Sequence, residues 1–216
     1  MAFGETFRAM AEGNPSTIYK LGIFGGTFDP IHMGHLAAAE RVREQAALDA
    51  VMFMPAGVPV FKLDRDVSKG EDRLAMCELA TKDNPNFDVS DIEVKRTGNT
   101  YTYETLRALR AYYPANVELY FIAGADAIIT LGKWRNAAEL TQLAHFIAMT
   151  RPGYSEDEAK RSVYVNGERL DVTFLEVPGL DISSSYLRAC VKDDRTIRYL
   201  VPESVRKYIM EHGLYR

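Results

Sequence analysis

The stretch from Gly22 to His35, with the sequence GIFGGTFDPIHMGH, constrains the fold of this chain more than any other. It begins inside an apolar run, residues 18–24, that is typical of a buried strand. Two glycines, an acidic turn and a proline follow, and His32 and His35 end the stretch where an alanine-rich helix is predicted. A strand, a tight glycine turn and a helix start form a geometry that binds phosphate groups. The two histidines indicate chemistry at this place as well as binding.

Short apolar runs alternate with amphipathic segments along the rest of the chain. Strands are predicted at residues 18–24, 51–54, 87–89, 92–94, 117–123, 144–150 and 172–177. Helices are predicted at residues 35–48, 71–84, 102–112, 182–188 and 202–212, with further helical material near Trp134. This alternation predicts an α/β fold, a doubly wound parallel sheet with a small C-terminal helical part.

The chain contains no internal repeat and no linker, so a single domain over residues 1–216 is predicted. Residues 1–16 show no strong periodicity and are expected to be a mobile leader or a late start of the fold. The charged segment 154–170 is expected to contain a helix and a small hairpin at Asn166–Gly167.

Composition excludes several classes of protein. The 216 residues are 47% hydrophobic, which is enough for one good core. The 26 basic and 30 acidic residues give a net charge of -4, which argues against non-specific nucleic-acid binding. Cys77 and Cys190 are far apart, as expected of a reduced intracellular protein. With neither an apolar run of membrane-spanning length nor a signal-peptide pattern, a cytoplasmic protein without a membrane partner is expected.

Gly25, Gly26 and Thr27 follow the first predicted strand directly. Glycines at a strand end allow a ligand phosphate to approach the backbone closely, although an ordinary turn uses them as well. The spacing does not match the GxGxxG pattern of dinucleotide-binding proteins, and the sequence contains no GxxxxGK[ST] phosphate loop. The glycines alone therefore leave a phosphate site and an ordinary turn equally open.

His32 and His35 favour the phosphate site. Residues three apart on a first helical turn share one face, and Gly34 between them keeps the approach to both imidazoles open. Imidazoles can donate hydrogen bonds to the charge that develops on a phosphoryl group. Helix capping is the structural alternative. A zinc site is not predicted, because no nearby Cys, Glu or His completes a ligand set.

Two further strand ends are expected at the same crevice. Ligands of doubly wound sheets bind outside the carboxyl ends of the strands, where Asp126 and Ser183 also lie in the predicted order. Ser183 and Ser184 open a predicted helix, whose first amides and hydroxyls bind anions. Arg188 lies about one turn further and can reach the same phosphates. The alternative for this helix start is a capping serine with a surface arginine.

Taken together, these motifs resemble the HxGH nucleotidyltransferases, and within them the nicotinate-nucleotide adenylyltransferases. The likeness covers about residues 18–215. The matching segments are GGTFDPIHMGH at residues 25–35, Pro55 with Pro59 and Lys62, Arg73, TYTYETL at 100–106, FIAGADA at 121–127 with Trp134, ISSSYLR at 182–188, and the C-terminal segment from Val201 to Tyr215. Departures from the family pattern are Val60, Phe61, Arg135 and Ser185.

The resemblance implies a Rossmann-like nucleotidyltransferase fold and adenylyl transfer from ATP to nicotinate mononucleotide. It implies catalytic roles for His32, His35, Lys62 and Arg188. The ATP-binding residues that it implies are Gly25, Gly26, Thr27, Phe28, His32, His35, Ser183, Ser184 and Arg188. The residues that it implies for the mononucleotide are Lys62, Thr102, Asp126, Trp134, Arg135 and Arg151. Mg²⁺ is expected to arrive with ATP, since no carboxylate cluster offers a site of its own, and a homodimer is left open.

Two other functions stay open at this point. A related enzyme would transfer its nucleotidyl group to nicotinamide mononucleotide or phosphopantetheine, or would transfer a cytidylyl group. The segments 100–106 and 124–134 argue against the last two of these. A nucleotide-binding regulator without catalysis is the second possibility, and the intact pair His32 and His35, together with Arg188, argues against it.

Overall fold

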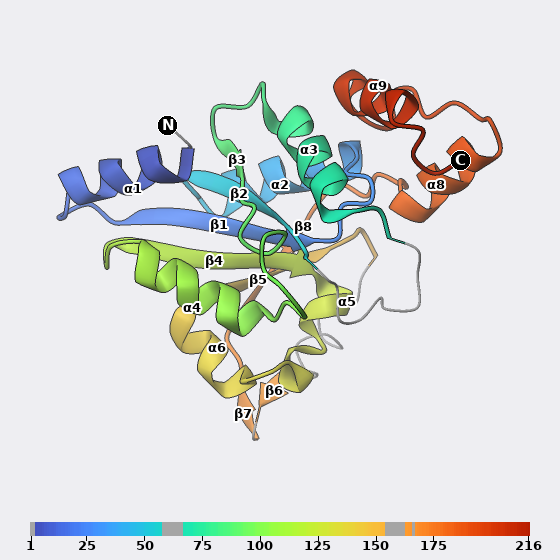
Figure 1. Cartoon of the computed structure of the whole chain (residues 1–216). Helices are drawn as coiled ribbons and strands as arrows, with labels where there is room; N and C mark the ends of the chain where they lie inside the picture. Colours follow the sequence, from blue (N-terminus) through green and yellow to red (C-terminus); the bar gives the residue numbers. More distant parts are fainter. Residues whose placement is uncertain (1–2, 58–66, 154–162, 166) are drawn as a thin grey trace.

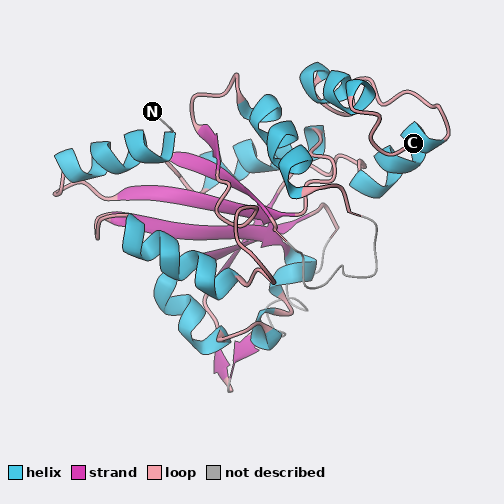
Figure 2. Ribbon diagram, in the orientation of Figure 1, coloured by secondary structure: helices cyan, strands magenta, loops and turns pink. Residues whose placement is uncertain are grey.

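A six-stranded parallel sheet forms the centre of the structure (Figures 1 and 2). The computed structural model describes residues 3–57, 67–153, 163–165 and 167–216. The strand order is β3-β2-β1-β4-β5-β8, and each neighbouring pair is parallel. The strands are β1 (Tyr19–Gly26), β2 (Ala50–Pro55), β3 (Phe87–Val89), β4 (Val117–Gly124), β5 (His145–Thr150) and β8 (Val172–Glu176). The predicted doubly wound parallel sheet is confirmed.

Helices cover both faces of this sheet (Figure 1). They are α1 (Phe3–Gly13), α2 (Met33–Gln45), α3 (Gly70–Thr81), α4 (Thr102–Tyr112), α5 (Ala125–Ile128), α6 (Ala137–Leu143), α8 (Ser184–Lys192) and α9 (Glu203–Glu211), with a 3-10 turn η2 (Leu131–Lys133). Within the described ranges, no helix has the length and apolar character needed to span a bilayer.

Two separate apolar cores explain why the strands read as nearly continuous hydrophobic runs. Side chains of α1, α4 and α6, such as Phe7, Leu106 and Leu140, pack on one face. Side chains of α2, α3, α8 and α9, such as Val42 and Met76, pack on the other. A parallel sheet covered on both faces buries both sets of alternating side chains. Burial of every residue of β2 is the direct result.

The order of the strands determines where a ligand can bind. The chain runs outward from β1 through β2 to β3 on one side, and from β4 through β5 to β8 on the other. A crevice forms where such an order reverses, at the carboxyl ends of the central strands. Here those ends are Gly26 of β1 and Gly124 of β4. Both positions belong to segments that the sequence singled out.

One predicted strand is wrong. Residues 92–94 form a turn, in which the Lys95 N–H donates to the Asp91 carbonyl oxygen at 2.9 Å. The Glu93 side chain is buried and accepts a hydrogen bond from Thr105 Oγ1 at 2.8 Å. The alternation of Ile92, Glu93 and Val94 is also typical of a short strand, which explains the wrong prediction. In the structure the buried Glu93 carboxylate accepts from Thr105 in α4, and this contact favours the turn.

The predicted hairpin is present as β6 (Tyr164–Val165) and β7 (Glu168–Arg169), which pair antiparallel. Gly167 in its turn has a φ of 83°, a conformation that favours glycine. The helix expected earlier in the segment 154–170 falls largely outside the described residues.

The N-terminal segment differs from the expected mobile leader. Residues 3–13 form α1, and Phe7 is buried with its ring edge-on to Tyr19 and Tyr113, at centroid distances of 6.0 and 6.2 Å. The side-chain amide of Asn116 donates to the Ala11 carbonyl oxygen at 3.0 Å. Phe7 and Ala11 are four residues apart and share the buried face. Phe3, Phe7, Met10 and Ala11 recur at the spacing of one helix face, so the period of α1 is present in the sequence and the expectation of a leader did not use it.

We expect Phe7→Ala to lower the free energy of unfolding by about 3 kcal/mol, because it leaves a cavity between α1 and the sheet. Met10→Ala, at an exposed position of the same helix, should change it by less than about 0.5 kcal/mol. Urea unfolding followed by circular dichroism measures both. Equal, small effects of the two substitutions would contradict the packing of α1.

Candidate active site

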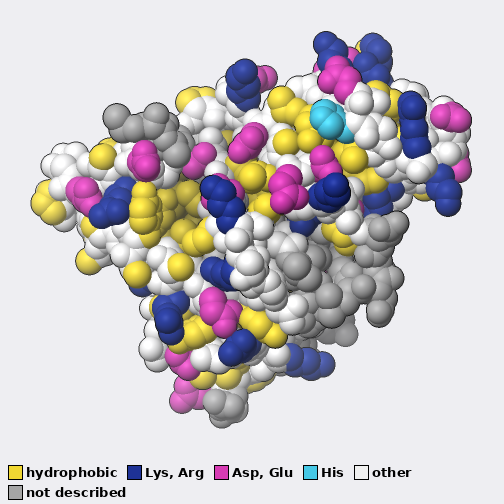
Figure 3. Space-filling view, in the orientation of Figure 1, with side chains coloured by type: hydrophobic (Ala, Val, Ile, Leu, Met, Phe, Trp, Pro, Cys, Tyr) yellow, Lys and Arg dark blue, Asp and Glu magenta, His cyan; other side chains and the backbone are white. Residues whose placement is uncertain are grey.

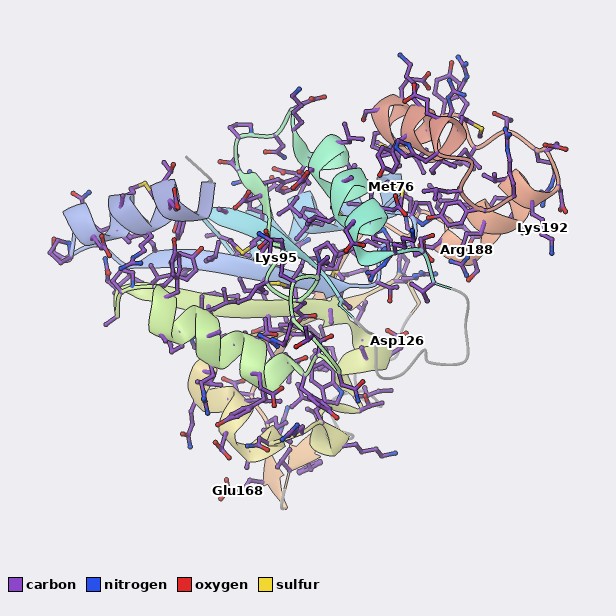
Figure 4. All side chains as sticks on the ribbon, viewed as in Figure 1. Met76, Lys95, Asp126, Glu168, Arg188 and Lys192 are labelled. Atoms are coloured by element: carbon purple, nitrogen blue, oxygen red, sulfur yellow. The ribbon has the colours of Figure 1, made fainter. Side chains whose placement is uncertain are left out.

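A cavity of about 660 Å³ lies at the carboxyl ends of β1, β4 and β5. The lining residues that the sequence had singled out are Gly25, Gly26, Phe28, His32, His35, Asp126, Arg151, Ser183 and Ser184. They come from four segments of the chain, and the predicted meeting of three strand ends at one crevice is therefore observed. Figure 4 labels Asp126 beside α5 and Arg188 on α8, both at the end of the sheet where the strands finish.

His32 and His35 lie face to face at the start of α2. Their ring centroids are 3.6 Å apart and the ring planes are inclined by 23°. His32 is the residue before the helix, and its backbone N–H donates to His35 Nδ1 at 3.3 Å. A neutral imidazole that accepts at Nδ1 carries its proton on Nε2, so this contact makes Nε2 of His35 a donor.

The His32 side chain stands in the capping position against the His35 N–H, but that N–H donates to the His32 carbonyl oxygen at 2.9 Å, and the buried Nδ1 of His32 makes no hydrogen bond of its own among the described residues. His32 is 5% exposed and lines the cavity. Burial lowers the pKa of its imidazole to about 4, and the positive charge of Arg151 acts in the same direction. The His32 ring is therefore neutral near pH 7 in the free protein. A buried polar atom without a partner points to a ligand.

Two glycines give the rings their room. A Cβ on Gly34 would lie 3.0 Å from His32 Nδ1, so a side chain between the histidines would crowd the ring. A Cβ on Gly26 would lie 2.7 Å from the Phe28 ring, which folds back over this glycine. The Phe28 ring in turn meets the His35 ring edge-on at 5.0 Å. The glycines thus serve close packing of the aromatic rings around the histidines.

The start of α8 faces the same cavity. Ser183 precedes the helix, and its Oγ accepts a hydrogen bond from the Tyr186 N–H at 3.2 Å. Ser184 Oγ donates to the Pro30 carbonyl oxygen at 2.9 Å. Arg188 donates to the Asp29 carbonyl oxygen at 2.8 Å, and a second nitrogen donates to Ser185 Oγ at 3.2 Å. All of these side chains are engaged within the protein, which is the structural alternative considered from the sequence.

Two buried charged residues lie beneath this region, and the sequence analysis gave neither a role. Arg73 of α3 is 1% exposed and donates to three backbone carbonyl oxygens, those of Thr27 at 2.8 Å, Gly57 at 2.9 Å and Ser68 at 3.0 Å. Asp29 is 2% exposed. Burial lowers the pKa of Arg73, and the Asp29 carboxylate opposes that shift. The sequence signals for this arrangement are an aspartate inside the glycine-rich stretch and the resemblance of Arg73 to an arginine of the family.

Three of the predicted mononucleotide residues, Thr102, Trp134 and Arg135, form a second group near the start of α4. Thr102 is the first residue of α4, and Tyr101 precedes it. The Arg135 guanidinium lies 4.7 Å from the centre of the Tyr101 ring and pairs with Glu104 at 3.3 Å. The Trp134 ring stands edge-on to Phe121, with centroids 5.8 Å apart. Arg135 thus contacts residues at the start of α4 and does not line the cavity.

The structure does not bring every predicted residue to the cavity wall. The predicted residues that it describes away from that wall are Thr27, Thr102, Trp134, Arg135 and Arg188. Lys62 lies outside the described residues, and its predicted role stays a prediction. Of the described His, Cys, Asp and Glu side chains, no three lie where they could hold a metal ion together.

Basic and acidic side chains are interspersed over the face drawn in Figure 3. At the cavity itself, Arg151 and the N-termini of α2 and α8 attract a phosphate.

Burial of a neutral His32 predicts a dependence of stability on pH. The unfolded chain takes up a proton near pH 6.5, whereas the folded protein does so only near pH 4. Stability from this residue is thus complete above about pH 6.5 and is lost as the pH falls toward 4. We expect about 2 kcal/mol of this loss between pH 7 and pH 5.

Urea unfolding of the wild type and of His32→Gln at the two pH values measures this difference. The variant should lose less stability than the wild type on acidification. His145→Gln, at an exposed histidine, should behave like the wild type. If His32→Gln and the wild type lose equal stability, His32 is not buried in its neutral form.

With this geometry in view, the chain can be compared with known proteins. The family model described as cytidylyltransferase-like matches residues 23–190. A probable nicotinate-nucleotide adenylyltransferase of Corynebacterium kroppenstedtii is 46% identical over 201 residues, which cover 93% of each chain. A protein of the same description from Desulfitobacterium hafniense is 45% identical over 199 residues, which cover 91% of this chain and 96% of the relative.

Solved structures share the fold at lower identity. The nicotinic acid mononucleotide adenylyltransferase of Plasmodium falciparum, complexed with NaAD, superposes with a TM-score of 0.74 at 19% identity. The superposition covers 91% of this chain and 97% of the Plasmodium chain. The family match, the identity and the coverage show that this chain belongs to the cytidylyltransferase-like family and, within it, to the nicotinate-nucleotide adenylyltransferases.

Proposed function

We propose that the protein transfers the adenylyl group of ATP to nicotinate mononucleotide and forms nicotinate adenine dinucleotide and pyrophosphate, a step of NAD biosynthesis. One observation carries this proposal more than any other. The buried Nδ1 of His32 has no partner among the described residues, and its ring is stacked on His35 at a cavity edged by two helix N-termini. Relatives 46% identical over nearly the whole chain carry the same description of activity.

The chemistry requires positioning more than proton transfer. The phosphate of the mononucleotide attacks the α-phosphorus of ATP in line, the new P–O bond forms, and the bond to pyrophosphate breaks. A phosphate dianion is already a competent nucleophile, so neither a general base nor a covalent enzyme intermediate is required. The protein lowers the barrier by orienting both substrates and by stabilising the charge on the transferring group.

The two histidines have different parts in this proposal. His35 donates from Nε2, because its Nδ1 accepts the His32 N–H. His32 is neutral before ATP arrives, and the negative phosphates raise its pKa once they lie beside it. Arg151, which lines the same cavity, supplies a fixed positive charge, and the first amides of α2 and α8 supply further donors.

On the side of the mononucleotide, the first turn of α4 is the proposed receptor for the nicotinate carboxylate. Backbone N–H groups of a first helical turn lack helical partners and favour an anion. Glu104 in this turn would repel that carboxylate, and its Oε2 is buried with no partner among the described residues. Arg135 pairs with its other oxygen and offsets the repulsion. Trp134 is the proposed surface for the pyridine ring.

Several expectations from the sequence remain part of this proposal. Mg²⁺ would come bound to ATP, since no three acidic or histidine side chains among the described residues could hold it, and it would supply positive charge to the phosphates. Lys62 and Arg188 assist at the phosphates. A homodimer and a cytoplasmic location stay predictions.

A turnover assay tests the reaction. With ATP, Mg²⁺ and nicotinate mononucleotide, the wild type should release pyrophosphate, and His35→Ala should lower kcat/KM by a factor of roughly 10² to 10³ because a donor to the transferring phosphate is lost. His145→Ala serves as the control at an exposed histidine. Circular dichroism confirms that each variant is folded.

Absence of turnover with every mononucleotide would leave a nucleotide-binding regulator as the better description. Normal turnover in His35→Ala would refute the role of this histidine while leaving the reaction itself in place.

The choice between acid and amide tests the α4 site separately. We expect kcat/KM for nicotinate mononucleotide to exceed that for nicotinamide mononucleotide by at least about tenfold, because the helix start favours a carboxylate. Arg135→Ala should reduce this ratio, since Glu104 then repels the acid without a counter-charge. Arg107→Ala, at an exposed position of α4, should leave the ratio unchanged. An unchanged ratio in Arg135→Ala would contradict this role.

A further inference from the structure

The C-terminal tail reaches back into the glycine-rich stretch. Tyr215 is the next-to-last residue of the chain, and its hydroxyl donates to Asp29 Oδ1 at 2.7 Å. The two residues are 186 positions apart in the sequence. Figure 1 shows the C-terminus beside α8 and α9, on the side of the sheet where α8 begins the cavity wall.

Asp29 and the adjoining backbone connect three other parts of the fold to the glycine-rich stretch. Its Oδ1 accepts from Tyr215, and its Oδ2 accepts from the Ser68 N–H at 3.2 Å. Its backbone carbonyl oxygen accepts from Arg188, and the next carbonyl oxygen, that of Pro30, accepts from Ser184. The tail, the segment before α3, and α8 therefore all meet at the Asp29–Pro30 backbone. His32 lies only two residues further along the chain.

The backbone of the tail is bent to make this contact. The backbone of Tyr215 has a φ of 66°, a left-handed conformation that residues other than glycine rarely adopt. Such a conformation persists only where surrounding contacts hold it. Burial raises the pKa of the Tyr215 hydroxyl above its ordinary range, and the hydrogen bond to Asp29 acts in the same direction. The hydroxyl is therefore a permanent neutral donor.

We propose that Tyr215 is a positioning residue for the ATP phosphates, which acts through Asp29 on Ser184, Arg188 and the histidine pair. Both oxygens of a buried carboxylate require hydrogen-bond donors. If one donor is removed, a neighbouring side chain turns from its own partner to the carboxylate. Arg73 already uses its nitrogens on three loop carbonyl oxygens, so Arg188, which donates to the Asp29 backbone, is the remaining candidate. The Tyr215 hydroxyl satisfies Oδ1 and so keeps the Arg188 guanidinium on the backbone carbonyl oxygen, where it holds the Asp29–Pro30 backbone beneath the cavity.

This inference rests on the proposed function only in taking ATP as the ligand, and it is independent of the acceptor. The chain offers a matched control in Tyr208 of α9. Its hydroxyl donates to Asp72 Oδ1 at 2.9 Å, so Tyr208→Phe removes the same kind of bond from the same end of the chain. Neither Tyr208 nor Asp72 lines the cavity.

Calorimetric titration with Mg-ATP, without a second substrate, tests the inference. Tyr215→Phe should raise the Kd for Mg-ATP about tenfold, because a hydrogen bond to a buried charge is lost, whereas Tyr208→Phe should change it less than about twofold. In turnover assays, KM for ATP should rise in Tyr215→Phe while KM for the mononucleotide stays constant. A purely structural loss would lower the active fraction, and hence the rate, without moving either KM.

Each outcome decides the inference. An unchanged Kd for Mg-ATP in Tyr215→Phe, or an equal increase in both tyrosine variants, would overturn it. A wild type that binds Mg-ATP but does not turn over nicotinate mononucleotide would refute the proposed acceptor, and the Kd values would still decide the role of Tyr215. A wild type that does not bind Mg-ATP would overturn both.

Discussion

The hydrogen bonds that buried Arg73 and buried Asp29 make to the surrounding loops and to the tail are the interactions on which the site depends. Both side chains are almost completely withdrawn from solvent. Taking charges out of water is costly, and the cost is offset only where opposite charge and hydrogen bonds compensate. Arg73 uses its donors on three loop carbonyl oxygens, and Asp29 uses its oxygens on the tail and on Ser68. The loops at the carboxyl end of the sheet are thereby tied to one another from below.

The hydrogen bonds of Arg73 and Asp29 explain how a largely neutral set of groups can form a phosphate site. His32 is held neutral by burial, and the first backbone amides of α8 are neutral donors. Positive charge comes from Arg151 at the wall, from Arg188 behind it and from the helix ends. Neutral donors at fixed positions require little reorganisation when charge develops during transfer. A site of this kind therefore relies on geometry, which the buried pair maintains.

Sequence patterns predicted the elements best where burial is regular. The bounds of α4 and the order of strands and helices follow from long apolar periods on a sheet covered on both faces. The false strand at residues 92–94 and the unexpected α1 have different causes. Glu93 is buried in a turn and accepts from Thr105 of another element, and no local pattern records that partner. In α1 the helical period of Phe7, Met10 and Ala11 is present in the sequence, and the expectation of a leader was wrong there.

The sequence by itself determined the fold class, the family and the meeting of the glycine-rich stretch with Asp126 and Ser183 at one crevice. These depend on local periodicity and on strand order, and both are written along the chain. Only the tertiary structure decided which partner each of these side chains binds. It showed that Ser184 and Arg188 bind the Asp29–Pro30 backbone, that Arg135 pairs with Glu104, and that Tyr215 closes the network. Such contacts join residues far apart in the sequence, and their geometry exists only once the sheet and its helices are packed.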